Sequence, residues 1–188
     1  MTGVTLILDE LAGKRLELLK EVAPRISNVA VLWNPDHADP EFREIQRAVH
    51  SSDVRIESLQ VRQDKDLEPA FQAATKAKVE ALIVVSSRLL NYNRDRIVDF
   101  TAKTRLPLIG DWGPWTTLGA LFSYGPDISE SVRRSAKILD KVLKGASPAE
   151  VPVERPTKFE FSVNMRAAQQ LRLEIPQSVL YRADKVIK

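Results

Sequence analysis

The sequence contains no cysteine, and its two histidines, His37 and His50, are not spaced as metal ligands. Without cysteine, neither a disulfide framework nor a thiolate metal site can form. We place His50 on a helix surface among charged neighbours and His37 in a loop at the end of a strand. These residue types therefore predict no metal site.

Glycine is also scarce, with seven residues in the chain and none between Lys14 and Leu106. The motifs Gly-x-Ser-x-Gly, Gly-x-x-x-x-Gly-Lys and Gly-x-Gly-x-x-Gly are all missing. In that interval, no turn from a strand into a helix can bring its backbone against a phosphate in the usual glycine-dependent way. We therefore expect no cofactor, no catalytic residues and no nucleotide-dependent enzyme.

Long apolar runs and an excess of one charge sign are absent too. No segment approaches the ~20 apolar residues of a membrane span, and Met1 to Asp9 has neither the basic residues nor the apolar length of a signal peptide. We therefore expect a chain that does not span a membrane and, as written, stays in the cytoplasm. The net charge of +3 comes from 28 basic and 25 acidic residues that are well mixed, which argues against a nucleic-acid partner.

One stretch, from Val29 to Phe42, indicates how the chain folds. Val29 to Trp33 is a short, unbroken apolar run, which is typical of a strand with both faces covered in a parallel sheet. Asp39 and Pro40 then suit the cap and the first position of a helix. Strand, loop and helix form the opening of a βαβ unit, so the loop Asn34 to Asp36 lies where ligands bind in open α/β sheets.

The same pattern repeats along the chain. Four apolar strands separated by three helices at regular spacing predict an α/β fold with a doubly wound, mostly parallel, Rossmann-like sheet. A further strand is expected at the start of the chain, before the first helix. The strands are predicted at 4–8, 29–33, 55–61 (near an edge), 81–85 and 106–109, and the helices at 9–22, 41–50, 66–77 and 94–103.

The pattern changes in the last third of the chain. Tyr124-Gly-Pro-Asp127 is typical of a turn, in which Asp127 caps a long helix at 128–144. A proline-rich connector follows that helix. The alternation at 158–163 predicts a strand with one buried face, and Asn164 is placed to cap a last helix.

Polar and aromatic side chains follow the predicted strands, at the edge where their carboxyl ends meet. Small hydroxyls, an amide, a carboxylate and aromatic rings suit a pocket for a small organic solute. Each residue alone has a structural alternative: Trp33 as core, Trp115 as a cover over apolar surface, Ser86 as a turn cap. The set comprises Trp33, Asn34, Ser86, Ser87, Asp111, Trp112, Trp115, Ser123 and Tyr124.

The same edge also carries carboxylates. Asp36, Asp39 and Asp111 could hold a hard cation there. The structural interpretation is stronger for two of them, because Asp39 suits a helix cap and Asp36 a turn.

Several longer motifs extend over nearly the whole chain and resemble one family. The sequence is similar to the solute-binding components of ABC transporters with a type I periplasmic-binding-protein fold, in the branch of tryptophan- and tyrosine-type binding proteins. The matching stretches are Thr2-Gly-Val4, 11–21, Val29-Ala-Val-Leu-Trp-Asn-Pro35, Ser123-Tyr-Gly-Pro-Asp127, 141–146, Pro152-Val-Glu-Arg-Pro-Thr-Lys-Phe-Glu160, 175–180 and Arg182-Ala-Asp184.

The resemblance implies a function and partners. In such proteins two α/β lobes close on a solute held between them, and the loaded form docks on a membrane permease; the full-length proteins are periplasmic or extracytoplasmic. The resemblance implies that this chain is the second lobe, without the secretion signal and most of the first lobe. Its segments would be 1–23 (crossover strand and first helix), 24–125 (ligand-binding lobe), 126–157 (crossover helix and connector) and 158–188 (returning strand, helix and tail).

The missing lobe has a consequence for the long helix. In the family the segment after the second crossover belongs to the first lobe, so the stripe Val132, Ala136, Leu139 and Leu143 would lack its usual cover. Apolar side chains of this kind gain roughly 25 cal/mol per Å² on burial. We therefore expect a homodimer through the 128–144 helix, by symmetric pairing or by exchange of the helix between protomers.

These observations lead to one preferred function and two alternatives. We expect non-catalytic binding of an amino acid or related solute, with Asp111 as the partner of a ligand amino group and the rings of Trp112 and Tyr124 beside its side chain. A flavodoxin-like enzyme or signalling domain using Asp36 and Asp111, and an oligomerising fragment without a ligand, are the alternatives. The expected binding residues are Asn34, Ser86, Ser87, Asp111, Trp112 and Tyr124.

Overall fold

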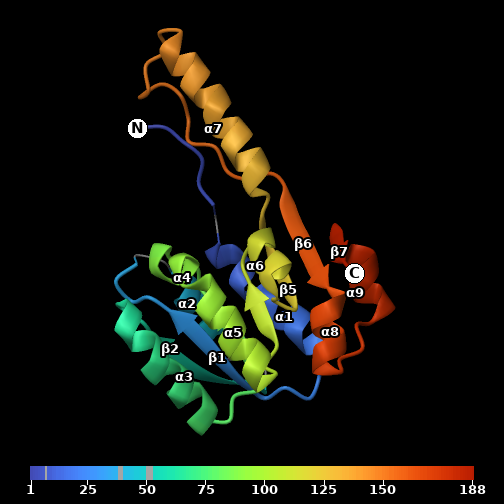
Figure 1. The fold of residues 1–188 in the computed structure, drawn as a ribbon. Coiled ribbons are helices and arrows are strands. Elements are labelled where there is room, and N and C mark those ends of the chain that lie inside the picture. The colour runs from blue at the N-terminus through green and yellow to red at the C-terminus, as the bar shows by residue number, and fades with distance from the viewer. Residues whose placement is uncertain (7, 38–39, 50–52) are drawn as a thin grey trace.

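The chain folds around one seven-stranded sheet with helices on both faces (Figure 1). The computed structural model describes residues 1–6, 8–37, 40–49 and 53–188. The strand order is β2-β1-β3-β4-β5-β6-β7, in which neighbours from β2 to β5 run parallel and β6 runs antiparallel to β5. The predicted α/β, mostly parallel architecture is therefore confirmed. Strand β2, which was predicted near an edge, lies at the edge of the sheet. The strands are β1 (Asn28–Trp33), β2 (Arg55–Gln60), β3 (Ala81–Val84), β4 (Leu108–Gly110), β5 (Phe122–Pro126), β6 (Phe159–Asn164) and β7 (Lys185–Ile187).

Strand β1 lies inside the sheet, between β2 and β3. Val29 and Val31 pack into one apolar cluster, whereas Ala30 and Leu32 pack into the cluster on the opposite face. All four side chains are fully buried. An unbroken apolar run is therefore required here, because alternate residues of a strand face opposite sides and both sides are covered.

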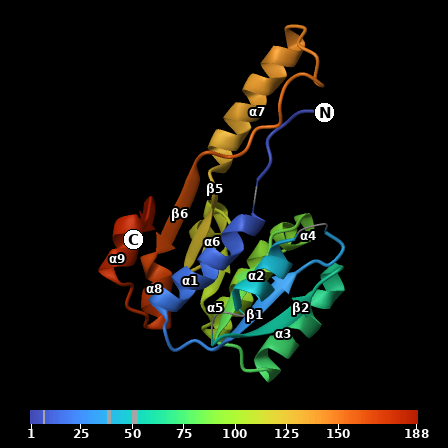
Figure 2. The ribbon, with the colours of Figure 1, turned by 180° about the vertical axis from the view of Figure 1, so that it is seen from behind.

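The helices form two layers. Apolar residues of α1, α2, α8 and α9 belong to the cluster on one face, and those of α3, α4, α5 and α6 to the cluster on the other. Figure 2 views the molecule from the opposite side, where the helices of the first layer can be followed. The helices of the lobe are α1 (Ala12–Val22), α2 (Glu41–Val49), α3 (Leu67–Lys76), α4 (Arg88–Tyr92), α5 (Arg94–Thr104), α6 (Gly113–Leu118), α8 (Met165–Leu171) and α9 (Gln177–Arg182), with short 3-10 turns η1 (Asp9–Leu11) and η2 (Asp64–Asp66).

Two local predictions differ from the structure. In place of the strand at 4–8, the described residues form one isolated parallel bridge, between Val4 and Glu154, and residue 7 lies outside the described residues. The predicted turn at 124–127 is instead the end of β5, which pairs with β6 through Tyr124 and Pro126. The partner strand comes from beyond the long helix, so long-range pairing overrides the local turn preference of Gly-Pro.

The long helix α7 (Ile128–Leu143) projects away from the sheet, with the connector and the N-terminal residues beside it in both views (Figures 1 and 2). Its start and end agree with the sequence: Asp127 accepts a hydrogen bond from the Glu130 N–H at 3.1 Å, and Gly145 follows with φ of +101°. We call residues 127–158 the arm. The backbone N–H of Asp127 donates to the Lys158 carbonyl at 3.0 Å, so the arm leaves and re-enters the lobe at one point.

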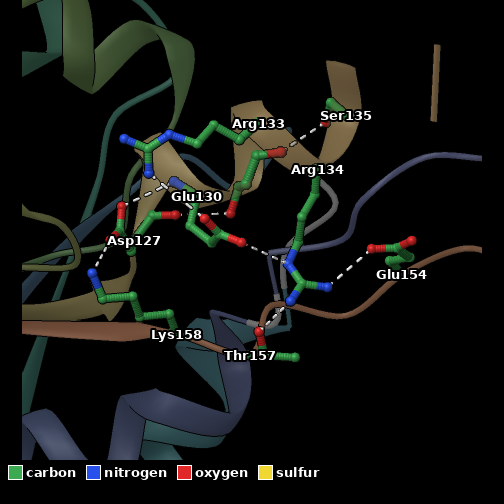
Figure 3. A network of polar contacts seen from close by, with 9 residues as sticks. Asp127, Glu130, Arg133, Arg134, Ser135, Glu154, Thr157 and Lys158 are labelled. Atoms are coloured by element: carbon green, nitrogen blue, oxygen red, sulfur yellow. Dashed lines mark hydrogen bonds and ion pairs between the residues drawn. The ribbon is translucent and has the colours of Figure 1, made fainter. Parts of the chain in front are cut away.

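Polar contacts attach α7 to the returning chain (Figure 3). The guanidinium of Arg134 donates to Glu130 at 3.2 Å, to Glu154 at 3.0 Å and to Thr157 at 2.6 Å. Lys158 forms an ion pair with Asp127 at 2.9 Å. Charged and polar groups therefore link the helix to the returning chain, and the apolar side chain of Ile138 is buried as well.

The outer face of α7 is apolar and exposed. Val132, Leu139 and Leu143 are 62%, 57% and 77% exposed, and Ala136 is exposed beside them. We call these four residues the α7 stripe. No helix in the described part of the chain is long and apolar enough to cross a membrane.

Candidate functional site

Five of the six expected binding residues lie just beyond the carboxyl ends of β1, β3 and β4, and the sixth, Tyr124, lies within the neighbouring strand β5. These four strands are consecutive neighbours in the sheet. Because parallel strands end at the same edge, the topology brings the residues to one side of the lobe. Asn34 follows β1, Ser86 and Ser87 follow β3, Asp111 and Trp112 follow β4, and Tyr124 lies within β5.

Asp111 is the most deeply placed of the six. No part of it is exposed to solvent, and one carboxylate oxygen, Oδ1, accepts a hydrogen bond of 2.6 Å from the Ser86 hydroxyl. The indole N–H of Trp115 donates to the same Ser86 oxygen at 3.2 Å. The other oxygen of Asp111, Oδ2, is buried and makes no hydrogen bond with any described residue. The edge thus contains a buried carboxylate of which only one oxygen accepts a hydrogen bond.

The charge state of Asp111 reflects opposing influences. Burial raises the pKa of the Asp111 carboxyl above its ordinary value, because an ionised group is poorly solvated there. The positive charge of Arg15 and the hydrogen bond from Ser86 lower that pKa. Burial is the largest effect, so the carboxyl is harder to ionise than one in water.

Ser87 and Asn34 differ in what they offer a ligand. Ser87 is buried and caps α4, since its hydroxyl oxygen accepts a hydrogen bond from the Leu90 N–H at 3.2 Å. Asn34 is partly exposed, and its side-chain oxygen accepts from the Asp36 N–H at 2.9 Å. The amide NH2 of Asn34 has no hydrogen-bond partner among the described residues, so it is available to an acceptor on a ligand.

The two partly exposed aromatic residues at the edge, Tyr124 and Trp112, pack on different apolar clusters. The Tyr124 ring lies edge-on to Phe161 at 6.1 Å and tilted against Phe159 at 6.4 Å between ring centroids. Trp112 is partly exposed and packs on the apolar cluster of the α3 and α5 face. Its indole N–H is buried and donates no hydrogen bond to the described residues. Sequence reasoning missed Phe159 and Phe161, because they reach the edge only through the antiparallel pairing of β6.

Sequence reasoning also missed a buried ion pair beneath the edge. Arg15 of α1 and Glu41 of α2 are both fully buried and form an ion pair. Arg15 also donates to the backbone carbonyls of Tyr124 at 2.9 Å and Leu8 at 3.3 Å. An arginine next to Leu16 on the buried stripe of a helix was the available signal, because a buried charge requires a partner.

The loops after β4 and β5 are fixed by a close backbone approach. A Cβ atom built on Gly125 would overlap the backbone carbonyl of Asp111. Glycine is therefore required at this position by space. The contact places Tyr124 directly beside the loop that carries Asp111 and Trp112.

The remaining polar and aromatic residues have structural partners. Trp33 stacks on Phe42 with 4.1 Å between ring centroids and donates its indole N–H to Ser58 at 2.9 Å. Trp115 is fully buried, as a core residue would be, and Ser123 accepts a hydrogen bond of 2.6 Å from Thr116. Next to Asn34, Trp33 and Phe42 help to line a cavity of about 520 Å³.

Two carboxylates of the alternative cation site, Asp36 and Asp111, have separate partners. Asp36 is exposed and forms an ion pair with Arg62, whereas Asp111 is buried against Ser86. Asp39 lies outside the described residues, as does His50. Within the described ranges, no three residues among His, Cys, Asp and Glu come together as potential metal ligands.

The fold is that of a lobe of a type I periplasmic binding protein. Residues 1–187 match the family described as ABC transporter substrate binding protein, and the chain belongs to this family. A search of curated sequences gives no match.

Three solved structures illustrate the similarity. An ABC domain from Streptococcus pneumoniae in complex with L-Trp is 24% identical, with a TM-score of 0.85 over 94% of this chain. A conserved domain protein from Vibrio cholerae is 21% identical, with a TM-score of 0.88 over 98% of the chain. A ligand-free, open substrate-binding protein with adhesive properties from Clostridium difficile is 17% identical, with a TM-score of 0.71 over the whole chain. This chain spans 62% of the length of each of these structures.

Proposed function

We propose that this chain is the second lobe of a non-catalytic, extracytoplasmic solute-binding protein, and that its solute is an amino acid or a related compound. The observation that carries the proposal is the half-used carboxylate of Asp111 at the edge formed by β1, β3, β4 and β5. A buried acceptor without a partner is costly, and a ligand ammonium group would satisfy it. The L-Trp complex of the pneumococcal structure supports the choice of solute class.

The six residues contribute in two ways. Asn34, Trp112 and Tyr124 are partly exposed, so they contact the solute first. Ser86, Ser87 and Asp111 are buried, and they form the polar floor beneath it. Because Asp111 is closed to solvent, an ammonium group reaches Oδ2 only after a neighbouring side chain moves aside. Aromatic rings beside the ligand then favour an apolar or aromatic side chain.

Affinity in the isolated chain should be low. A solute held by one lobe leaves its other face in water, so much of the usual contact area is missing. We expect dissociation constants of about 1 mM, equivalent to about 4 kcal/mol. In the complete protein, a facing lobe would close over the solute and the loaded form would dock on an ABC permease.

A titration with amino acids tests this function. We expect L-Trp or another amino acid to bind by titration calorimetry, and Asp111→Asn to weaken binding by about tenfold, since a hydrogen bond to a charged group contributes about 1.5–3 kcal/mol. Asp99→Asn, on the exposed side of α5, is the matched control and should leave affinity unchanged. Failure of every amino acid to bind, or equal affinity for Asp111→Asn and the parent, would contradict the proposal.

The α7 stripe supports a proposal about assembly as well. A symmetric, antiparallel pairing of two α7 helices sets Val132 of one copy against Leu143 of the other, and Ala136 against Leu139. Large residues then face small or medium ones along the whole stripe, which is a self-complementary arrangement for a two-fold axis.

The division of the chain at residues 23, 125 and 157 stays a prediction, with the α7 segment as the unit that leaves the lobe.

Light scattering on the parent and on Leu139→Asp tests the assembly. The parent should be a dimer at micromolar concentration and Leu139→Asp a monomer of unchanged lobe stability, because the changed side chain makes no core contact. Lys137→Gln, on the flank of the stripe, lowers the net charge by the same one unit and is the control that should remain dimeric. A monomeric parent would overturn the dimer without affecting the proposed solute site.

A further inference from the structure

A second cavity lies at the opposite edge of the sheet from the candidate solute site. It has a volume of about 430 Å³, within the range of small-molecule sites. Its lining includes Ile26, Glu80 and Pro107, which come shortly before β1, β3 and β4. The cavity therefore sits where these parallel strands begin.

The walls of this cavity are apolar and firmly placed. Val22, Ala23 and Ile26 contribute apolar atoms from the end of α1, and Leu171 and Leu173 contribute them from the end of α8. The loop between α1 and β1 is held by Lys20, whose ammonium donates to the carbonyls of Pro24 and Ile26 at 2.8 Å each. A preformed apolar wall reduces the ordering cost of binding a ligand.

The lining contains one carboxylate, that of Glu80, and it already accepts hydrogen bonds. Oε2 of Glu80 accepts hydrogen bonds from the backbone N–H groups of Ser27 at 2.7 Å and Asn28 at 2.9 Å. These bonds hold the Glu80 side chain against the start of β1. Glu80 is therefore committed to the loop, and it forms no ion pair with an arginine among the described residues.

The lining also contains two arginines, Arg25 and Arg105. The guanidinium groups of Arg25 and Arg105 make no hydrogen bond or ion pair with any residue that the structure describes. Arg105 is held at its backbone instead, as the left-handed cap of α5 with φ of +54°. It also lines a neighbouring cavity of about 270 Å³, together with Leu171. The rim thus offers two positive charges, one of them placed between two cavities.

We propose that this cavity binds a small apolar carboxylate, with its hydrocarbon body against the walls from α1 and α8 and its carboxylate at Arg25 and Arg105. Guanidinium groups pair with carboxylates through parallel N–H···O bonds, which are stronger than bonds between neutral groups. An apolar body with one negative charge matches both the walls and the rim. The site is separate from the proposed amino-acid site and does not depend on it.

A matched pair of probes tests the proposal: 1-naphthaleneacetate and its neutral amide, 1-naphthaleneacetamide. The carboxylate should bind the parent at least about tenfold more tightly than the amide, and Arg25→Gln/Arg105→Gln should remove that preference. Arg55→Gln, an exposed arginine at the start of β2 outside the cavity lining, is the control and should retain it. Backbone amide shifts of Ala23, Ile26 and Leu173 should report the bound probe by NMR.

Two outcomes would overturn the site. Equal affinity for the acid and the amide would show that the arginines do not recognise charge. Amide shifts confined to Asn34, Trp112 and Tyr124 would place the probe at the other edge of the sheet. Because the readout is local and uses no amino acid, failure here leaves the solute-binding proposal standing, and the reverse also holds.

Discussion

Arg15 and Glu41 form an ion pair with no solvent exposure on either side chain, between the first two helices of the lobe. Arg15 extends the contact to the carbonyls of Tyr124 and Leu8. The pair and these hydrogen bonds thus tie α1, the start of α2 and β5 together.

We expect Arg15→Met to destabilise the lobe by about 3–5 kcal/mol, since it removes the guanidinium that pairs with the buried carboxylate of Glu41. Arg15→Met/Glu41→Leu should recover most of that loss, because no buried charge then remains. Urea unfolding monitored by tryptophan fluorescence gives both values. A double variant as unstable as the single one would mean that the bonds from Arg15 to the two carbonyls, and not the ion pair, stabilise this region.

Asp111 gives a prediction about pH. Its folded pKa is raised by burial, so folding disfavours the ionised form. The stability of the parent should therefore fall as pH rises from the ordinary aspartate value of 3.8 through the higher folded value, and level off above it. Asp111→Asn has no such group, so between acid and neutral pH the free energy of unfolding of the parent should fall relative to that of the variant. Parallel pH profiles for the two proteins would contradict this.

Gly125→Ala should destabilise the lobe by about 3 kcal/mol or more, because the new methyl group meets a backbone carbonyl that cannot move without shifting β4. Gly13→Ala is the matched control. Gly13 lies within α1, and a carbon added there would contact the Cβ of Ala48 in α2 at 3.4 Å. Because alanine favours a helix more than glycine does, stability should rise by up to about 1 kcal/mol. Thermal unfolding of both variants makes the comparison, and similar effects at the two sites would refute the assigned role of Gly125.

Asp127 should control the stability of the arm. Its pKa is lowered by Lys158 and by the N–H of Glu130, so its contribution is present above the ordinary value of 3.8 and is lost as pH falls through the lower folded value. Asp127→Ala should cost the helix about 1 kcal/mol at neutral pH, the usual effect of losing an N-cap. Hydrogen exchange of the α7 amides should quicken while that of β1 does not change. Exchange that quickens equally in β1 would show that the arm and the lobe unfold as one unit.

The sequence predicted most of the parallel part of the fold. The apolar runs at Val29 to Leu32 and at Ala81 to Val84 are local signals, and the caps at Asp127 and Asn164 are placed as expected. The helices α4 and α6 were not predicted, because five or six residues are too few to show a helical period. Strand β7 was missed for a related reason, since Lys185–Ile187 is short and half polar.

The candidate site was predictable in position but not in its contacts. The rule that ligands bind where parallel strands end was sufficient to select Asn34, Ser86 and Asp111. The pairing of Tyr124 with Phe161, and the role of Arg15, depend on segments far apart in the sequence. No local periodicity encodes such contacts, because they arise only when β6 and α1 have docked on the sheet.

The arm is rooted in two neighbouring strands that run in opposite directions, β5 leading out and β6 leading back. Tyr124 lies two positions before the end of the outgoing strand, opposite Phe161 on the returning one. Because these two strands are paired side by side, the contact between the rings of Tyr124 and Phe161 lies at the root of the arm. The base of α7 and this aromatic contact therefore rest on the same pair of strands.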